Sequence, residues 1–228
     1  MKLTEIQKTY DHVISLGYWC DGASQLRNKN LRREAFPFDW MLTPSLGSIS
    51  SLIRTDFKDY MTMENLIAIG QSNILVDMDV IDEKNITQVV YDKKYHIASV
   101  HDIPLASEEE WPYLYKEYIL KVQRRVDRFT RVLSSNDTIL FIRVSGNTGE
   151  VARLIQALDD KSKGPYTLLI INPTDEVETI FEENIPELKN VCFVNVPLKY
   201  NDTFLDILTI KRIDQTYWDS ILNGITLS

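Results

Sequence analysis

The feature that most constrains the fold is an alternation of apolar strands with helical segments in the second half of the chain. The pattern predicts strands at Thr138–Ile142, Tyr166–Ile171 and Val191–Val196, with a helix at Glu150–Leu158 between the first two. Near-continuous apolar strands that alternate with helices are typical of a parallel sheet covered on both faces. An apolar run at His12–Leu16 adds a strand near the start. The sequence therefore predicts an α/β fold: three layers around a mostly parallel sheet, Rossmann-like or SGNH-like.

The remaining patterns predict helices and one small β insertion within this fold. The expected helices are Ala23–Arg33, Ser45–Phe57, Glu108–Leu133 and Glu176–Phe181. Residues 73–103 predict an antiparallel insertion, with short strands at Ile74–Val76, Ile86–Val90 and His96–Val100. Because no repeat or long linker interrupts the chain, we expect a single domain over residues 1–228.

Composition excludes several classes of protein. The formal net charge is -8, which disfavours non-specific binding of a nucleic-acid backbone. Only two cysteines occur, too few for a disulfide scaffold or an all-cysteine zinc site. Three scattered histidines show no metal-binding spacing, so we expect no metal and no cofactor. No signal peptide or membrane-spanning run is recognisable, and we expect a cytoplasmic protein that does not bind membranes. The oligomeric state stays open.

Cys20 is the first candidate for chemistry. It follows Gly17 by three residues, just beyond the first predicted strand and before a predicted helix. Ligands of open α/β sheets bind beyond the carboxyl ends of the strands, and a helix N-terminus favours a thiolate. Cys20 is thus a candidate nucleophile, although a small buried residue at a strand–helix junction is the plainer interpretation. Cys192, inside a predicted strand, is interpreted as a core residue.

A cysteine nucleophile needs a base, and His101 is the best candidate. It ends a predicted strand beside a loop, from which a side chain can reach another strand's tip. Asp102 or Asp39 would orient the imidazole. Adjacent strand residues point to opposite faces, so Asp102 is also compatible with an outward orientation. A satisfied surface or hinge histidine is the alternative interpretation for His101.

Three other features have two interpretations each. The aromatic segment around Asp39 and Trp40 is compatible with a pocket wall or with a core loop. Asn147, between a strand and a helix, is compatible with anion binding but is more typical of a helix N-cap. The arginines of the long helix are compatible with binding an anionic substrate, but a solvated face paired with nearby acids is the commoner arrangement. The arginines considered for this role are Arg124, Arg125 and Arg128.

The first 40 residues also carry a recognisable motif set. It comprises Ile14-Ser15-Leu16-Gly17-x-x-Cys20, Leu26-Arg27, Leu31-Arg32 and Ala35-x-Pro37-Phe38-Asp39-Trp40. Later segments continue it: Val100-His101-Asp102, Arg124-Arg125-x-x-Arg128-Phe129 and Leu140-Phe141-Ile142-Arg143. Together they resemble a bacterial domain family of unknown function that is described as putative papain-like cysteine peptidases. The resemblance is strongest from Ile14 to Trp40 and weak after Tyr166.

The resemblance implies a Cys–His centre at Cys20 and His101. Papain-like enzymes place the nucleophile on a helix that packs against an antiparallel β-barrel. The pattern of this chain instead predicts a parallel sheet with Cys20 after its first strand, a placement closer to that of the serine nucleophile in SGNH-type esterases. The leading hypothesis is a cysteine-dependent hydrolase or acyl transferase that acts on a small-molecule, glycan or peptide substrate. The alternative is a glycan- or nucleotide-sugar-handling protein, enzyme or binding module, in which Cys20 is structural. Its substrate-binding residues would be Trp40, Arg27, Arg143 and Asn147, together with Asp39.

Overall fold

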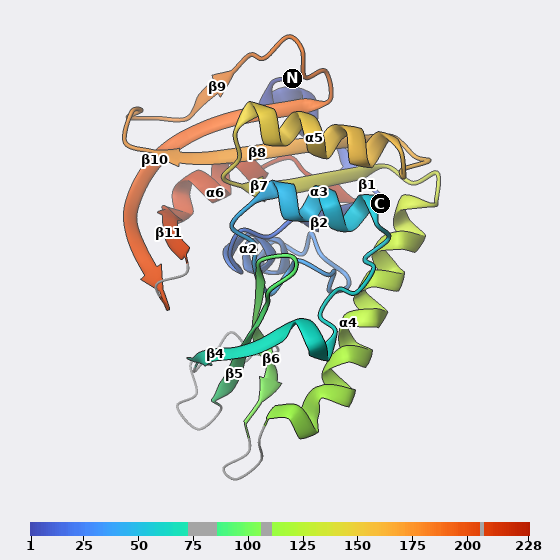
Figure 1. The fold of residues 1–228 in the computed structure, drawn as a ribbon. Coiled ribbons are helices and arrows are strands. Elements are labelled where there is room, and N and C mark those ends of the chain that lie inside the picture. Colours follow the sequence, from blue (N-terminus) through green and yellow to red (C-terminus); the bar gives the residue numbers. More distant parts are fainter. Residues whose placement is uncertain (73–85, 106–110, 206–207) are drawn as a thin grey trace.

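A computed structural model describes residues 1–72, 86–105, 111–205 and 208–228 (Figure 1). The strand expected at Ile74–Val76 lies outside the described residues. Two sheets carry most of the strands, one mainly parallel and one antiparallel, so the α/β class with both kinds of strand is confirmed. In the described residues, no helix combines the length and the apolar character that crossing a bilayer requires.

The larger sheet has the strand order β11-β10-β8-β7-β2, with β9 paired to β10. The pairs β2–β7, β7–β8 and β8–β10 are parallel, whereas β11 and β9 pair antiparallel with β10. The strands are β2 (His12–Ser15), β7 (Ile139–Val144), β8 (Tyr166–Thr174), β9 (Phe181–Glu183), β10 (Val191–Phe204) and β11 (Leu208–Ile213). The long strand β10 curves strongly, so that its first half pairs with β8 and its second half with β11 (Figure 1).

Alternate residues of these strands enter two different hydrophobic clusters. Phe141 and Ile170 belong to one cluster, whereas their neighbours Ile142 and Leu169 belong to the other. The first cluster includes residues of α3 (Leu46–Arg54), α4 (Trp111–Leu133) and α5 (Thr148–Asp159). The second includes residues of α1 (Leu3–Ile6), α2 (Asp21–Asn28) and α6 (Gln215–Leu222). The sheet is therefore buried on both faces, as its continuous apolar strands require.

The smaller sheet is antiparallel and has the order β3-β6-β5-β4. Its strands are β3 (Met41–Leu42), β4 (Leu66–Ser72), β5 (Thr87–Asp92) and β6 (Ile97–Pro104), and the 3-10 helix η1 (Met63–Asn65) precedes β4. Helix α4 contacts β6 and runs from this sheet towards the larger one (Figure 1). Two strands of the sheet, β3 and β4, come from sequence that precedes the predicted insertion.

The structure corrects several predicted boundaries. Helix α2 ends at Asn28 rather than Arg33, because Asn30 adopts a left-handed conformation and the Leu31 amide donates to the Leu26 carbonyl at 2.8 Å. The predicted helix at Glu176–Phe181 is wrong: residues 176–180 are irregular and Phe181 starts β9. None of these residues is buried, so no apolar face exists to stabilise a helix there. Strands β1 (Thr9–Tyr10) and β12 (Thr226–Leu227), which pair with each other, had no sequence prediction.

Candidate active site

The Cys20 segment begins where β2 leaves the parallel sheet. The Leu16 amide still donates to the Ile142 carbonyl of β7 at 2.8 Å, and the chain then turns sharply. Gly17 and Tyr18 have positive φ values of 74° and 86°. Glycine is required at position 17 because a Cβ atom there would lie 2.5 Å from Oγ1 of Thr43. Positive φ is costly at Tyr18, so the surrounding contacts must hold this turn in place.

Cys20 is the N-cap residue of α2. Its carbonyl accepts the first helical hydrogen bond, from the Ser24 amide at 3.0 Å, and its side chain is 7% exposed. The positive end of the helix dipole lies beside the thiol, which favours the thiolate form. The next amides of the first turn have no intrahelical acceptor, as at every helix start. The structure thus places the cysteine after the first strand of the sheet and at a helix start.

His101 comes from the antiparallel sheet, where it lies in β6 and is 3% exposed. Its Nε2 atom lies 3.2 Å from Sγ of Cys20, within hydrogen-bonding distance. The two residues are 81 positions apart in the chain, and α2 and β6 bring them together. A thiol and an imidazole at this distance can exchange a proton, which is the arrangement that nucleophilic catalysis by cysteine needs.

Trp40 covers the imidazole from the segment that precedes β3. Its ring lies edge-on to His101, with centroids 6.4 Å apart and an interplanar angle of 80°. The Arg32 guanidinium stacks on the same indole at 4.9 Å. Trp40 is only 3% exposed, so little of its ring is open to solvent or to a ligand. Such packing restricts the orientations open to His101.

Asp102, the neighbour of His101 in β6, is held by α4. Its carboxylate accepts two hydrogen bonds from Arg125, at 2.7 and 2.8 Å, and a third from Ser99 at 3.2 Å. Burial by itself would raise the pKa of Asp102, but the charge and hydrogen bonds of Arg125 outweigh burial and bring that pKa below its ordinary value. Because adjacent strand residues point to opposite faces, Asp102 faces α4 while His101 faces Cys20.

Asp39 is the second fully buried carboxylate near the site. One oxygen, Oδ2, accepts bonds from Arg32 at 2.9 Å and from the Phe36 amide at 2.8 Å. The other oxygen, Oδ1, is buried without a hydrogen-bond partner among the described residues. Burial raises the pKa of Asp39, although Arg32 acts in the opposite direction. Asp39 therefore closes the loop that presents Trp40 to His101.

Arg143, in β7, forms hydrogen bonds that hold the turn before Cys20 in place. Its guanidinium donates to the Leu16 carbonyl at 2.9 Å, to Oγ1 of Thr43 at 2.6 Å and to the Thr43 carbonyl at 2.6 Å. The same guanidinium lies 5.4 Å from the ring centre of Tyr18. Burial lowers the pKa of Arg143 to about 9. Arg143 thus ties the end of β2 to the chain that follows Trp40.

The other predicted side chains occupy separate positions. Arg27 is half-buried in the last turn of α2. Asn147 is exposed and caps α5, where its Oδ1 accepts from the Glu150 amide at 2.9 Å. Cys192 lies in β10 with no exposure, and burial raises the pKa of its thiol to about 12. The interpretation of Cys192 as a core residue agrees with this position.

The prediction of a solvated arginine face on α4 is wrong for Arg125, which is 5% exposed and lies against Asp102. A signal was present, because Arg125 follows the buried Val122 by three residues and precedes the buried Phe129 by four. Thr43 and Arg32 were also missed as supporting residues. Thr43 contacts Arg143, 100 residues away, and no local pattern reports such a contact, whereas Arg32 lies only seven residues before its partner Asp39.

Within the described part of the chain, no group of three or more His, Cys, Asp or Glu side chains is placed to hold a metal ion. The contact that the geometry offers for chemistry is that of the buried thiol and imidazole, 3.2 Å apart. Its two members lie at the start of α2 and in the antiparallel strand β6.

One relative, "Uncharacterized protein R408" of Acanthamoeba polyphaga mimivirus, is 29% identical over 175 residues, which is 72% of this chain and 78% of the relative. Its source is a virus, whereas the resemblance pointed to a bacterial family. No solved structure matches the chain. A family model described as "Putative papain-like cysteine peptidase (DUF1796)" matches residues 11–172, which include both Cys20 and His101. The chain belongs to this family.

Proposed function

We propose that the protein is a cysteine-dependent hydrolase or acyl transferase in which Cys20 is the nucleophile and His101 the general base. The observation that carries the proposal is the 3.2 Å contact between Sγ of Cys20 and Nε2 of His101. Family membership supports the same class of chemistry at a coarse level. The substrate would be an acyl compound, drawn from small molecules, glycans or peptides.

The chemistry follows from the positions of the two side chains. His101 accepts the thiol proton, and the thiolate of Cys20 attacks the carbonyl carbon of the substrate. The carbon–leaving-group bond then breaks, and the imidazolium returns the proton to the leaving group. Water, or another nucleophile in a transferase, attacks the thioester and gives its proton to His101. The carbon–sulfur bond breaks, and His101 returns its proton to the sulfur of Cys20, which restores the starting thiol and imidazole.

The developing oxyanion requires hydrogen-bond donors. The amide of Tyr18 is already engaged by Oγ1 of Thr43 at 2.5 Å. The first-turn amides of α2 that follow Cys20 are the better candidates, because a helix leaves these N–H groups without internal acceptors. In this proposal the same helix start favours the thiolate and stabilises the oxyanion.

Asp102 and Asp39 would act as positioning residues. Asp102 fixes β6, and with it His101, to α4 through Arg125. Asp39 closes the loop that carries Trp40, whose ring packs on the imidazole. We also propose that the parallel sheet is the middle of a three-layer core, Rossmann-like or SGNH-like. The hydrophobic clusters on its two faces and the position of Cys20 after its first strand support that assignment.

The proposal is tested by the reaction of Cys20 with iodoacetamide at a series of pH values, read by intact mass and peptide mapping. We expect a midpoint well below that of a free thiol, which is about pH 8.5. A Cys192→Ser variant should give the same profile, since Cys192 is buried in β10. A midpoint at or above that of a free thiol would contradict activation of Cys20.

A second test detects the covalent intermediate. p-Nitrophenyl acetate carries a good leaving group, so attack by a thiolate forms an acetyl thioester and releases p-nitrophenolate. We expect one acetyl group on Cys20 in the wild type and none in Cys20→Ala. His101→Ala should slow the acetylation strongly, because the base is gone. Acetylation of wild type and His101→Ala at equal rates would remove His101 from the proposed mechanism.

A further inference from the structure

Strand β6 is irregular at His101. Before the irregularity Ser99 pairs with Val90 of β5, and after it Ile103 pairs with Gln88. One residue of β5 therefore stands opposite three residues of β6, which are Val100, His101 and Asp102. A β-bulge of this kind interrupts the hydrogen bonds of the ladder and re-aims a side chain, and bulges are common next to active sites.

The hydroxyl of Thr87 supplies a hydrogen bond within this bulge. Thr87 lies in β5 with no exposure, and its Oγ1 donates to the Val100 carbonyl at 2.7 Å. The same atom lies 3.1 Å from the Ser72 carbonyl of β4, so the contact with the bulge is the shorter of the two. A buried carbonyl is costly without a donor, and the Val100 carbonyl belongs to the peptide bond that leads into His101. Thr87 therefore fixes the main chain from which the imidazole extends.

A contact between two other side chains shows that the bulge turns the strand. Oγ of Ser99 donates to Oδ2 of Asp102 at 3.2 Å. In a regular strand, residues three positions apart point to opposite faces, so this contact depends on the bulge. The same turn leaves Asp102 bonded to Arg125 while His101 points to Cys20.

We propose that Thr87 is a positioning residue for His101, and that it acts through the Val100 carbonyl. Its hydroxyl holds the bulge in the shape that brings Nε2 of His101 to 3.2 Å from Sγ of Cys20. This role rests on the proposed function, in which that contact activates the thiol. Thr87 itself takes no part in the proton transfer, because its hydrogen bond is to the main chain beside His101.

Three neutral substitutions test this role. Thr87→Val removes the hydroxyl and keeps the branched shape, whereas Thr87→Ser keeps the hydroxyl and loses only a methyl group. The matched control is Thr167→Val, which changes a buried threonine of β8 in the larger sheet. The charged side chains packed around the bulge and around Trp40 include Arg32, Asp39, Asp102, Lys121 and Arg125. No variant alters any of them, so a change in the acid–base behaviour of Cys20 would report on geometry.

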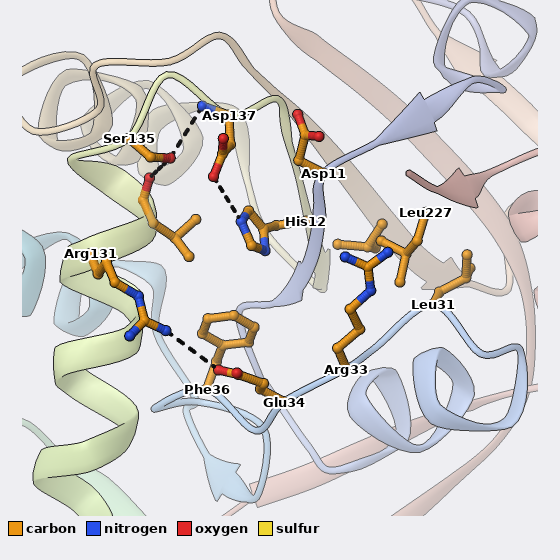
Figure 2. A pocket seen from close by; sticks show the side chains of 12 residues that line it. Asp11, His12, Leu31, Arg33, Glu34, Phe36, Arg131, Ser135, Asp137 and Leu227 are labelled. Atoms are coloured by element: carbon orange, nitrogen blue, oxygen red, sulfur yellow. Dashed lines mark hydrogen bonds and ion pairs between the residues drawn. The ribbon is translucent and has the colours of Figure 1, made fainter.

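NMR of the imidazole groups reports on position, and the other two histidines of the chain are internal references. His12 lies in a pocket at the other end of β2, where its Nε2 contacts Asp137 at 3.1 Å (Figure 2). His96 precedes β6, and its Nδ1 lies 2.7 Å from the hydroxyl of Tyr91. Single His→Asn variants assign the three sets of signals. Alkylation of Cys20 by iodoacetamide at a series of pH values reports on activation of the thiol.

In Thr87→Val we expect the His101 signals to shift and those of His12 and His96 to stay in place. Alkylation of Cys20 at pH 7 should slow about threefold to tenfold, because a small misplacement of a catalytic group has effects of this size. The alkylation midpoint should also move to higher pH, which a loss of stability alone would not cause. Thr87→Ser and Thr167→Val should match the wild type in both measurements.

Urea unfolding should confirm that each variant is folded at the start of the experiment. If Thr87→Val does not fold, Thr87→Ala replaces it, since it removes the same hydroxyl with a smaller side chain. The proposal is overturned, and the proposed function left intact, if wild-type Cys20 has a lowered midpoint that the variant without the hydroxyl shares. It is also overturned if Thr87→Ser behaves as Thr87→Val does. A wild-type midpoint equal to that of a free thiol would instead overturn the proposed function, and the role of Thr87 with it.

Discussion

The two buried aspartates near Cys20 and His101 have opposite acid–base behaviour. Both side chains are fully buried and both contact an arginine. Arg125 donates two hydrogen bonds to Asp102, whose pKa is lowered, whereas Arg32 donates one to Asp39, whose pKa is raised by burial. The comparison indicates that burial raises the pKa of a buried carboxyl group unless enough charge and hydrogen bonds from its partners outweigh that effect, as they do at Asp102 and not at Asp39.

The difference assigns distinct structural roles to the two groups. Asp102 joins β6 to α4 as a fully formed ion pair, with Lys121 as a second cation at 3.8 Å. Asp39 closes a local loop, through the amide of Phe36, three residues earlier in the chain. Loss of the first contact should loosen the packing of two large elements, whereas loss of the second should affect one loop.

Among the variants, Arg125→Met is expected to lower the free energy of unfolding the most. The substitution keeps much of the side chain's apolar contact but leaves the Asp102 carboxylate buried without its main cation. Removing one partner of a buried pair costs about 3–5 kcal/mol of unfolding free energy. This loss of unfolding free energy is measured by urea unfolding, with tryptophan fluorescence as the signal.

Two further variants control this prediction. Arg124→Met changes an exposed arginine of the same helix and should cost no more than about 0.5 kcal/mol. Asp102→Leu added to Arg125→Met should recover part of the loss, since no unpaired charge remains. Equal stabilities of Arg125→Met and Arg124→Met would show that the ion pair contributes nothing.

The next largest effect is the difference in stability between the variants Asp102→Asn and Asp39→Asn. In Asp102→Asn the buried Arg125 loses its counterion, and we expect a loss of about 2–4 kcal/mol. In Asp39→Asn the raised pKa already reflects the poor accommodation of the charge, and we expect about 1 kcal/mol. Urea unfolding at pH 7 distinguishes them. A larger loss for Asp39→Asn would reverse the comparison.

The sequence predicts one of the two aspartate environments better than the other. Asp39 is surrounded by residues of its own segment, and the aromatic pattern around it already indicated a core loop or a pocket wall. The partner of Asp102 lies 23 residues away on a helix, and it was assigned to the solvated face. Helical periodicity places Arg125 beside Val122 and Phe129, yet an arginine on an apolar stripe is recognised as buried only when its counterion is known.

The same reasoning explains what could be predicted about the fold and the site. Apolar strands and helix periodicity predicted β7, α5, β8 and the start of β10, because each pattern is local. The proximity of Cys20 and His101 was expected only from strand ends and from the family motif, since no local rule determines how the antiparallel sheet lies against α2. Residues after Val196 carried no prediction. Strand β11 depends on pairing with β10, whereas α6 has local signals that were not used: an N-cap at Asp214 and buried residues at Trp218, Ile221 and Leu222.

A smaller effect concerns the pH dependence of stability. The pKa of Asp102 is lowered in the folded state, so its stabilising contribution is complete above the ordinary value of 3.8 and is lost as the pH falls through the folded pKa. The pKa of Asp39 is raised, so its contribution is present below 3.8 and is lost as the pH rises through the folded pKa. The stability difference between wild type and Asp102→Asn should therefore shrink between pH 7 and pH 3.

The corresponding difference for Asp39→Asn should change in the opposite direction. Wild type gains from protonation of Asp39 on acidification, and the asparagine variant does not. Urea unfolding at several pH values measures both differences on the same preparations. Parallel changes in the two variants would mean that the two carboxyl groups do not differ in pKa as the structure indicates.

The smallest expected effect is on the reactivity of Cys20. Because Asp102 holds β6, Asp102→Asn should displace His101 slightly and slow alkylation of Cys20 by iodoacetamide about threefold to tenfold at pH 7, as small misplacements of catalytic groups do. Its alkylation midpoint should also move to higher pH, which a purely structural loss of stability would not cause.

Asp39→Asn should slow the reaction by less than about threefold, because it acts only through the loop of Trp40. Asp59→Asn, which removes an exposed partner of Lys94, is the matched control and should leave the midpoint unchanged. If Asp39→Asn moves the midpoint more than Asp102→Asn does, then the loop that carries Trp40, rather than the ion pair behind β6, is what positions His101.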